Sequence, residues 1–142
     1  MESYLELEGV DCIWLGRDSL GRMAAFVTAG VGPIPKDVLS KIGMPILDIE
    51  QFICDSLPKS TTGKMLIDVP RPDDFLDLSN RGFFVYDWPD VHRKFSERSG
   101  CYELISVPEA PINIEDVPNF KNLRIYEKFD LEFFLSKKIE II

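Results

Sequence analysis

The sequence has no long hydrophobic run, and this absence excludes a membrane-spanning segment. Its apolar stretches are four or five residues long, such as Met23–Val27, whereas a transmembrane helix needs about 20 residues. Acidic rather than basic residues follow Met1, so we expect no signal peptide and a cytoplasmic location. The chain has 142 residues, of which 45% are hydrophobic. We therefore expect a single domain over residues 1–142, built around its own core.

Histidine and cysteine are scarce, which limits the chemistry open to the chain. His92 is the single histidine, so a site with two histidine ligands is excluded. Cys12, Cys54 and Cys101 lie far apart and form no CxxC pair, so we predict buried free thiols and no structural zinc site. No catalytic or cofactor-binding motif is recognisable, and we expect a protein that is not an enzyme and holds no metal or cofactor.

Basic residues are outnumbered, with 16 Lys and Arg against 24 Asp and Glu and a net charge of −8. Phosphate binding requires the opposite field, so nucleic acid and anionic membranes are not expected as partners. The acidic residues concentrate in segments 1–15, 45–57 and 68–90, and the first two contain no Lys or Arg. Such segments form either a solvated surface or a docking face for a basic protein.

The first thirty residues predict a β-hairpin. Two β-prone apolar runs, 12–15 and 23–28, flank a turn-rich stretch. Asp18 supplies a side-chain acceptor for the reversal, and Gly21 supplies a residue that readily takes positive φ. We expect Trp14 and Phe26, on the two strands, to lie in the core.

The remaining elements follow from proline positions and apolar spacing. Gly30–Pro35 is interpreted either as a stiff connector or as the wall of a ligand pocket. Helices are predicted at 35–43, 45–57 and 73–80. Strands are predicted at 64–69, 83–88, 101–107 and 123–129, with a loop at 91–100 and an extended connector at 112–119. The order predicts an α+β fold, with a mainly antiparallel sheet and two or three short helices packed against it.

Segment 68–90 contains the candidate partner-binding residues. Tyr86-Asp87-Trp88 ends a predicted strand, and aromatic residues flanked by carboxylates are typical of interface anchors. Alternatively, Trp88 lies in the core at the end of that strand. The candidate set is Asp68, Asp73, Asp74, Asp77, Tyr86, Asp87, Trp88 and Asp90. If this face is only solvated surface, segments 1–15 and 45–57 are the next candidates.

Two blocks of the chain resemble small bacterial immunity proteins, which are encoded beside toxins of contact-dependent inhibition and related polymorphic toxin systems. The first block comprises Asp11–Trp14, Gly21–Gly30 and Gly32–Pro35, and the second Tyr86–Trp88 with Tyr102–Pro108. The resemblance implies a cytosolic, non-enzymatic inhibitor that caps one toxin domain, often a nuclease with a basic active site. The alternative is a small cytosolic enzyme or ligand-binding domain that uses the Gly30–Pro35 loop and nearby carboxylates.

Overall fold

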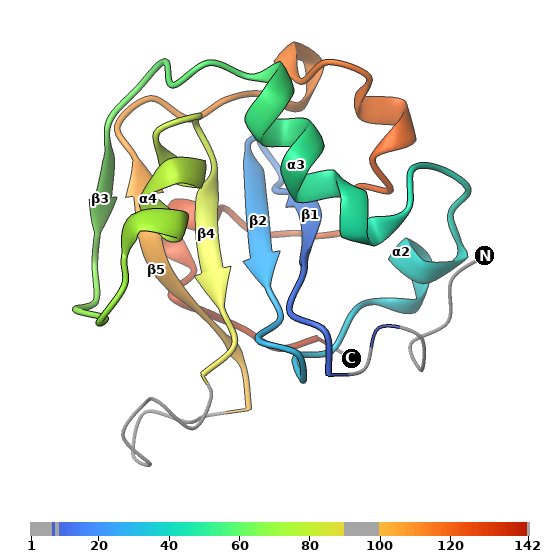
Figure 1. The fold of residues 1–142 in the computed structure, drawn as a ribbon, viewed down its shortest axis with the longest axis horizontal. Helices are drawn as coiled ribbons and strands as arrows, with labels where there is room; N and C mark the ends of the chain where they lie inside the picture. The colour runs from blue at the N-terminus through green and yellow to red at the C-terminus, as the bar shows by residue number, and fades with distance from the viewer. Residues whose placement is uncertain (1–6, 8, 90–99, 142) are drawn as a thin grey trace.

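The computed structural model describes residues 7, 9–89 and 100–141. A curled sheet runs through these residues in the strand order β1-β2-β4-β5-β3, and β6 also pairs with β5 (Figure 1). The strands are β1 (Ile13–Arg17), β2 (Met23–Val27), β3 (Gly63–Met65), β4 (Phe84–Asp87), β5 (Tyr102–Pro108) and β6 (Lys138–Ile139). Neighbouring strands are antiparallel except β2 and β4, which are parallel. The prediction of an α+β fold with a mainly antiparallel sheet is confirmed.

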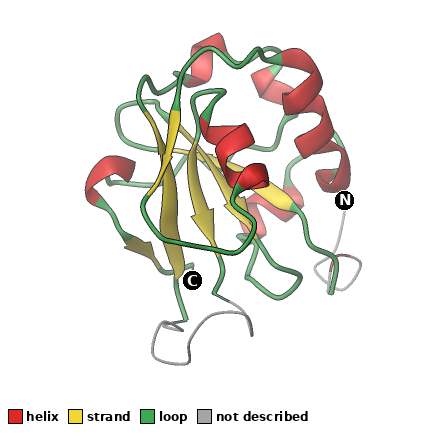
Figure 2. Ribbon diagram, turned by 60° about the vertical axis from the view of Figure 1, so that its left-hand side comes forward, coloured by secondary structure: helices red, strands yellow, loops and turns green. Residues whose placement is uncertain are grey.

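In the described part of the chain, a proline immediately precedes each of three helices. They are α2 (Lys36–Ser40), α3 (Ile46–Ser56) and α4 (Asp73–Ser79), preceded by Pro35, Pro45 and Pro72. Helix α3 buries Ile46, Ile49 and Ile53 on one face, and its opposite face remains exposed. Helices α3 and α4 cover one face of the sheet, and the C-terminal segment crosses the other, as Figures 1 and 2 show. No helix in the described part of the chain is long and apolar enough to span a membrane.

The predicted β1–β2 hairpin is present, and Asp18 organises its turn. One carboxylate oxygen of Asp18 accepts hydrogen bonds from the backbone N–H groups of Leu20 and Arg22, at 3.0 and 2.9 Å. The other oxygen accepts from the Arg22 side chain and from the backbone N–H of Phe133. Gly21 takes the expected positive φ of 82°. The same carboxylate therefore shapes the turn and ties the C-terminal segment to it.

The core contains Trp14 and Phe26, as the predicted hairpin leads us to expect. It also contains Tyr86, which the sequence pattern predicts to be a partner-binding residue. Trp14 and Phe26 are fully buried and stack with their ring centroids 4.0 Å apart. Tyr86 continues the stack at 4.9 Å from Phe26 and is also fully buried. Its hydroxyl donates to the backbone carbonyls of Phe133 and Ser136. Strand β4 is thus covered on both faces, by the helices and by the C-terminal segment.

The predicted strand at 123–129 is wrong. Arg124 has a φ of 55°, which breaks an extended run, and the consecutive residues Leu123, Arg124 and Ile125 are all buried. Tyr126 makes a single isolated bridge to Gly16 of β1. Residues 123–137 instead form an irregular C-terminal strap across the sheet, which includes the 3₁₀ turn η4 (Phe133–Leu135). The predicted extended connector at 112–119 likewise contains a 3₁₀ turn, η2 (Ile114–Asp116), and η3 (Phe120–Asn122) follows it.

Other predicted boundaries need smaller corrections. Strand β3 covers the three residues Gly63–Met65 rather than the six of 64–69, although the backbone N–H of Leu66 still donates to the carbonyl of Ile105 in β5. The cysteines are free, but only Cys12 is fully buried, while Cys54 and Cys101 are half-buried. The loop predicted at 91–100 falls outside the described residues except for Gly100, as does His92.

Candidate functional site

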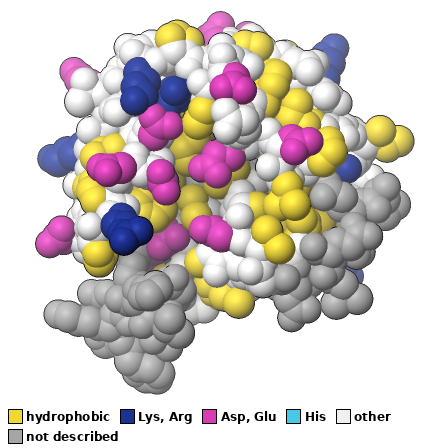
Figure 3. Space-filling view, viewed as in Figure 1, with side chains coloured by type: hydrophobic (Ala, Val, Ile, Leu, Met, Phe, Trp, Pro, Cys, Tyr) yellow, Lys and Arg dark blue, Asp and Glu magenta, His cyan; other side chains and the backbone are white. Residues whose placement is uncertain are grey.

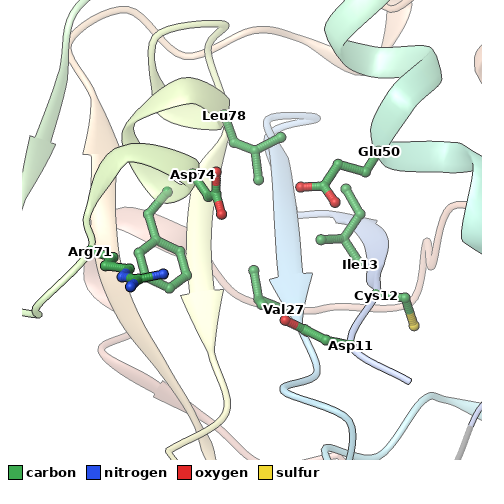
Figure 4. A pocket seen from close by; sticks show the side chains of 9 residues that line it. Asp11, Cys12, Ile13, Val27, Glu50, Arg71, Asp74 and Leu78 are labelled. Atoms are coloured by element: carbon green, nitrogen blue, oxygen red, sulfur yellow. The ribbon is translucent and has the colours of Figure 1, made fainter. Parts of the chain in front are cut away.

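The three acidic segments meet at a cleft between helices α3 and α4. Asp11 comes from the first segment, Glu50 from the second and Asp74 from the third, and all three line a hollow of about 110 Å³. The complete lining is Asp11, Cys12, Ile13, Val27, Glu50, Arg71, Asp74, Phe75 and Leu78. In Figure 4 the side chains of Glu50 and Asp74 extend from the two helices toward the middle of the cleft, and Ile13, Val27 and Leu78 lie between and around them. The cleft therefore has acidic walls and an apolar floor.

Ordinary local structure brings each carboxylate to the cleft. Asp11 lies two residues before β1 and accepts a hydrogen bond from the backbone N–H of Ala29, which fixes the chain beside the end of β2. Glu50 follows the buried Ile49, so it emerges on the side of α3 that borders the cleft. Asp74 lies in the first turn of α4, where the helix dipole favours a negative charge. The buried faces of the helices thus determine where these acids project.

The cleft disfavours ionisation of its own glutamate. Partial burial raises the pKa of Glu50, and the nearby charges of Asp74, Asp11 and Asp77 raise it further. Both effects penalise the charged carboxylate relative to the neutral acid. Among the described residues that line the cleft, Arg71 alone is basic. A cation entering between Glu50 and Asp74 would relieve this penalty.

Asp77, although close in sequence, serves a different purpose. Its carboxylate pairs with Arg81 at 2.7 Å and with Lys59 at 3.0 Å, and it accepts a hydrogen bond from the Cys54 thiol at 3.4 Å. Burial alone would raise the pKa of Asp77, but the hydrogen bonds from Arg81, Lys59 and Cys54 outweigh it and lower the pKa. Asp77 is therefore half-buried, and its carboxylate is engaged within the protein by Arg81, Lys59 and Cys54.

The Asp77 cluster holds α3 and α4 together. Arg81 donates from its guanidinium to the carbonyl oxygens of Cys54 and Leu57, at the C-terminal end of α3, and pairs with Asp77 on α4. Burial, and then the hydrogen bond to Asp77, raises the pKa of Cys54 to about 11, so its thiol is protonated and unreactive at neutral pH. The cluster is a brace that sets the position of one wall of the cleft against the other.

The remaining predicted binding residues differ in their exposure to solvent. Tyr86 has no exposed surface and is removed as a surface anchor. Trp88 is half-buried and packs edge-on against Tyr102 at 5.2 Å, which corresponds to the alternative of a core position at the strand end. Asp87 is half-buried beside Val27 and Glu103 in the sheet. Asp68 and Asp73 are exposed, whereas Asp90 lies outside the described residues.

Of the residues predicted from the sequence to bind a partner, Asp74 lies in the lining of the cleft, and Asp73 is next to it on α4. Sequence reasoning did not single out Asp11 and Glu50 as binding residues. The signal that locates them is the acidity of segments 1–15 and 45–57, which ranked as secondary candidates. Nothing in the sequence pattern reveals that the three segments share one cleft, because the sheet order decides it.

The Gly30–Pro35 loop is a packed connector. A side chain at Gly32 would meet the Tyr102 hydroxyl at 2.6 Å and Trp88 at 3.0 Å. The same hydroxyl accepts from the Trp14 indole N–H and donates to the carbonyl of Pro33. No residue of the loop lines the cleft. These contacts fill the space beneath the loop and favour the connector interpretation over the pocket wall.

In the described part of the chain, no group of three His, Cys, Asp or Glu side chains is placed to hold a metal ion. No protein-family model matches the chain, and no curated protein or solved structure is significantly similar to it.

Proposed function

We propose that the protein is an immunity protein that binds and neutralises a cognate toxin domain, a basic nuclease, in the cytoplasm. It acts by protein–protein contact, without catalysis, metal or cofactor. The observation that carries the proposal is the convergence of three acidic segments on the cleft between α3 and α4. The sequence resemblance to immunity proteins supplies the identity of the partner, and the acidic cleft supports a partner of basic character.

The charge distribution suits such a partner. Figure 3 shows Asp and Glu side chains gathered over the middle of the face that carries the cleft, with hydrophobic side chains between and beside them. Acidic side chains attract a basic protein during encounter and raise its association rate, while apolar surface between them adds contact area. A nuclease whose basic surface binds phosphate offers the complementary charge.

A growth-rescue experiment tests the function. The toxic domain encoded by the gene adjacent to this one is expressed in a bacterial host, with and without the protein. We expect full rescue of growth by the wild-type protein and a stable complex on gel filtration. The absence of both rescue and complex would overturn the proposal.

Two double charge-reversal variants test whether the surface around the cleft binds the toxin domain. Glu50→Lys with Asp74→Lys, and the control Glu115→Lys with Asp116→Lys outside the cleft, each change the net charge from −8 to −4. We expect the cleft pair to slow association with the toxin domain by about tenfold and to flatten its salt dependence, while the control pair has a much smaller effect. Equal slowing by both pairs would show that net charge alone matters. Asp77 is left unchanged because its reversal would break the brace.

The alternative is a small enzyme or ligand-binding domain that uses the Gly30–Pro35 loop and nearby carboxylates, and the position of that loop does not favour it. The Gly30–Pro35 loop is filled by Tyr102 and Trp88 and does not reach the cleft. The hollow of about 110 Å³ is also small compared with the roughly 300–1,000 Å³ of pockets that enclose drug-sized ligands. The facing carboxylates of Glu50 and Asp74 are the feature that keeps acid–base chemistry as a second candidate. Loss of growth rescue together with a substrate-dependent activity would favour it.

A further inference from the structure

The cleft between α3 and α4 combines two features that one kind of side chain would satisfy together. Its walls present the facing carboxylates of Glu50 and Asp74, with Asp11 at one end. Its floor is apolar, and Ile13 and Leu78 within it are almost fully buried. The hollow is about 110 Å³, which accommodates the end of one long side chain rather than a whole small molecule.

A guanidinium group matches this combination better than an ammonium group. It is planar, so its edge donates hydrogen bonds to carboxylates on either side while its weakly hydrated face lies against apolar surface. An ammonium is a compact and strongly hydrated point charge, and it gains less from an apolar floor. The half-buried Phe75 in the lining adds an aromatic side chain of the kind on which guanidinium groups stack.

We propose that the cleft is the receptor for an arginine side chain of the partner protein, held between Glu50 and Asp74. This inference rests on the proposed function, since it names the partner group that the acidic face recognises. The brace formed by Arg81 and Asp77 supports it, because it fixes the distance between the helices that carry the two carboxylates. A preformed gap loses less free energy on binding than one that must be ordered.

The proposal also predicts that the affinity of the cleft for the guanidinium group depends on pH. The charged groups near Glu50 are Asp11 before β1, Asp74 and Asp77 on α4, and Arg71 before α4. The acidic neighbours and partial burial raise the pKa of Glu50 in the unbound protein, and a bound guanidinium would lower it. Binding therefore releases a proton in the acid range, and affinity increases as the pH rises through the pKa of unbound Glu50.

The test uses N-acetyl-arginine amide and N-acetyl-lysine amide as probes, each with a single positive charge. Both are titrated into the ¹⁵N-labelled protein, and chemical-shift changes are followed residue by residue. We expect saturable changes at the amides of the cleft lining, with the lysine probe bound about fivefold more weakly. The variants Glu50→Gln and Asp74→Asn should each weaken arginine binding by about fivefold, and Asp116→Asn, outside the cleft, should leave it unchanged.

The results separate this inference from the proposed function. Shift changes scattered over the acidic surface, or equal affinity for the two probes, would overturn the arginine receptor even if growth rescue succeeds. Selective arginine binding at the cleft together with failed growth rescue would retain the receptor and overturn the immunity function. An affinity that does not change between pH 4 and pH 7 would contradict the role given to Glu50.

Discussion

The Asp18 carboxylate offers the sharpest test of how the fold is held together. It is completely buried, and it accepts hydrogen bonds from two N–H groups of its own turn and from Phe133 of the C-terminal strap. It also pairs with Arg22, whose side chain reaches Glu132 of the same strap. The substitution Asp18→Asn preserves the shape of the side chain but replaces one acceptor oxygen with an NH₂ donor.

The expected loss of unfolding free energy depends on the groups that would lie next to the new NH₂ group. If the remaining oxygen keeps the turn N–H groups, the NH₂ group points at the N–H of Phe133 and at the Arg22 guanidinium, which are both donors. Breaking one side of a buried ion pair costs about 3–5 kcal/mol. Arg22 is partly exposed and retains Glu132, so we place the loss of unfolding free energy near the lower end, at about 3 kcal/mol.

Urea denaturation followed by circular dichroism measures this loss. With a slope of about 2 kcal/mol per molar urea, the midpoint should fall by about 1.5 M. The exposed control Asp116→Asn, on the 3₁₀ turn η2, should change the free energy of unfolding by less than about 0.5 kcal/mol. An Asp18→Asn midpoint as close to wild type as that of the control would refute the claim that this carboxylate joins the hairpin to the strap.

Two further predictions concern the brace beside the cleft. Arg81→Met should lower the free energy of unfolding by about 3 kcal/mol, because the carbonyl oxygens at the end of α3 lose their guanidinium donor and Asp77 loses its nearest cation. Lys59→Met, at the exposed end of the same cluster, should cost less than about 1 kcal/mol in the same denaturation experiment. Alkylation of native Cys54 by iodoacetamide, mapped by mass spectrometry, should accelerate about tenfold per pH unit from pH 8 to pH 10, because the thiolate forms only near pH 11. A plateau near pH 9, the behaviour of an ordinary thiol, would contradict the raised pKa of Cys54.

The features that the sequence predicts correctly are those determined within a few residues. Asp18 and Gly21 specify the hairpin turn because a side-chain acceptor and a positive φ act locally. Prolines precede all three described helices, since a fixed φ and a missing N–H favour the start of a helix. The apolar spacing of α3 predicts its buried face directly.

The errors arise where distant segments decide the outcome. Alternation at 123–129 predicts a half-buried strand, but Arg124 takes a left-handed conformation, and the segment becomes a strap over a sheet face that needs a cover. Tyr86 illustrates the same difficulty, because its anchor role assumes a strand with one exposed face. Strand β4 is buried on both faces, so its continuous apolar run Phe83–Tyr86 is entirely core.

The candidate site depends on the same long-range order, and this order is our reason for proposing a docking face rather than a solvated surface. A solvated acidic surface gains by spreading its charges apart, which lowers their mutual repulsion. Here the fold places Glu50 and Asp74 face to face across a hollow, with Asp11 at its end. Partial burial, and then the charges of these neighbours, raise the pKa of Glu50. An exposed position on α3 accepts many polar residues without this penalty, and we therefore propose that a cationic group of the partner binds beside Glu50. The same reasoning makes Glu50 the residue whose neutral replacement should separate binding from folding most cleanly.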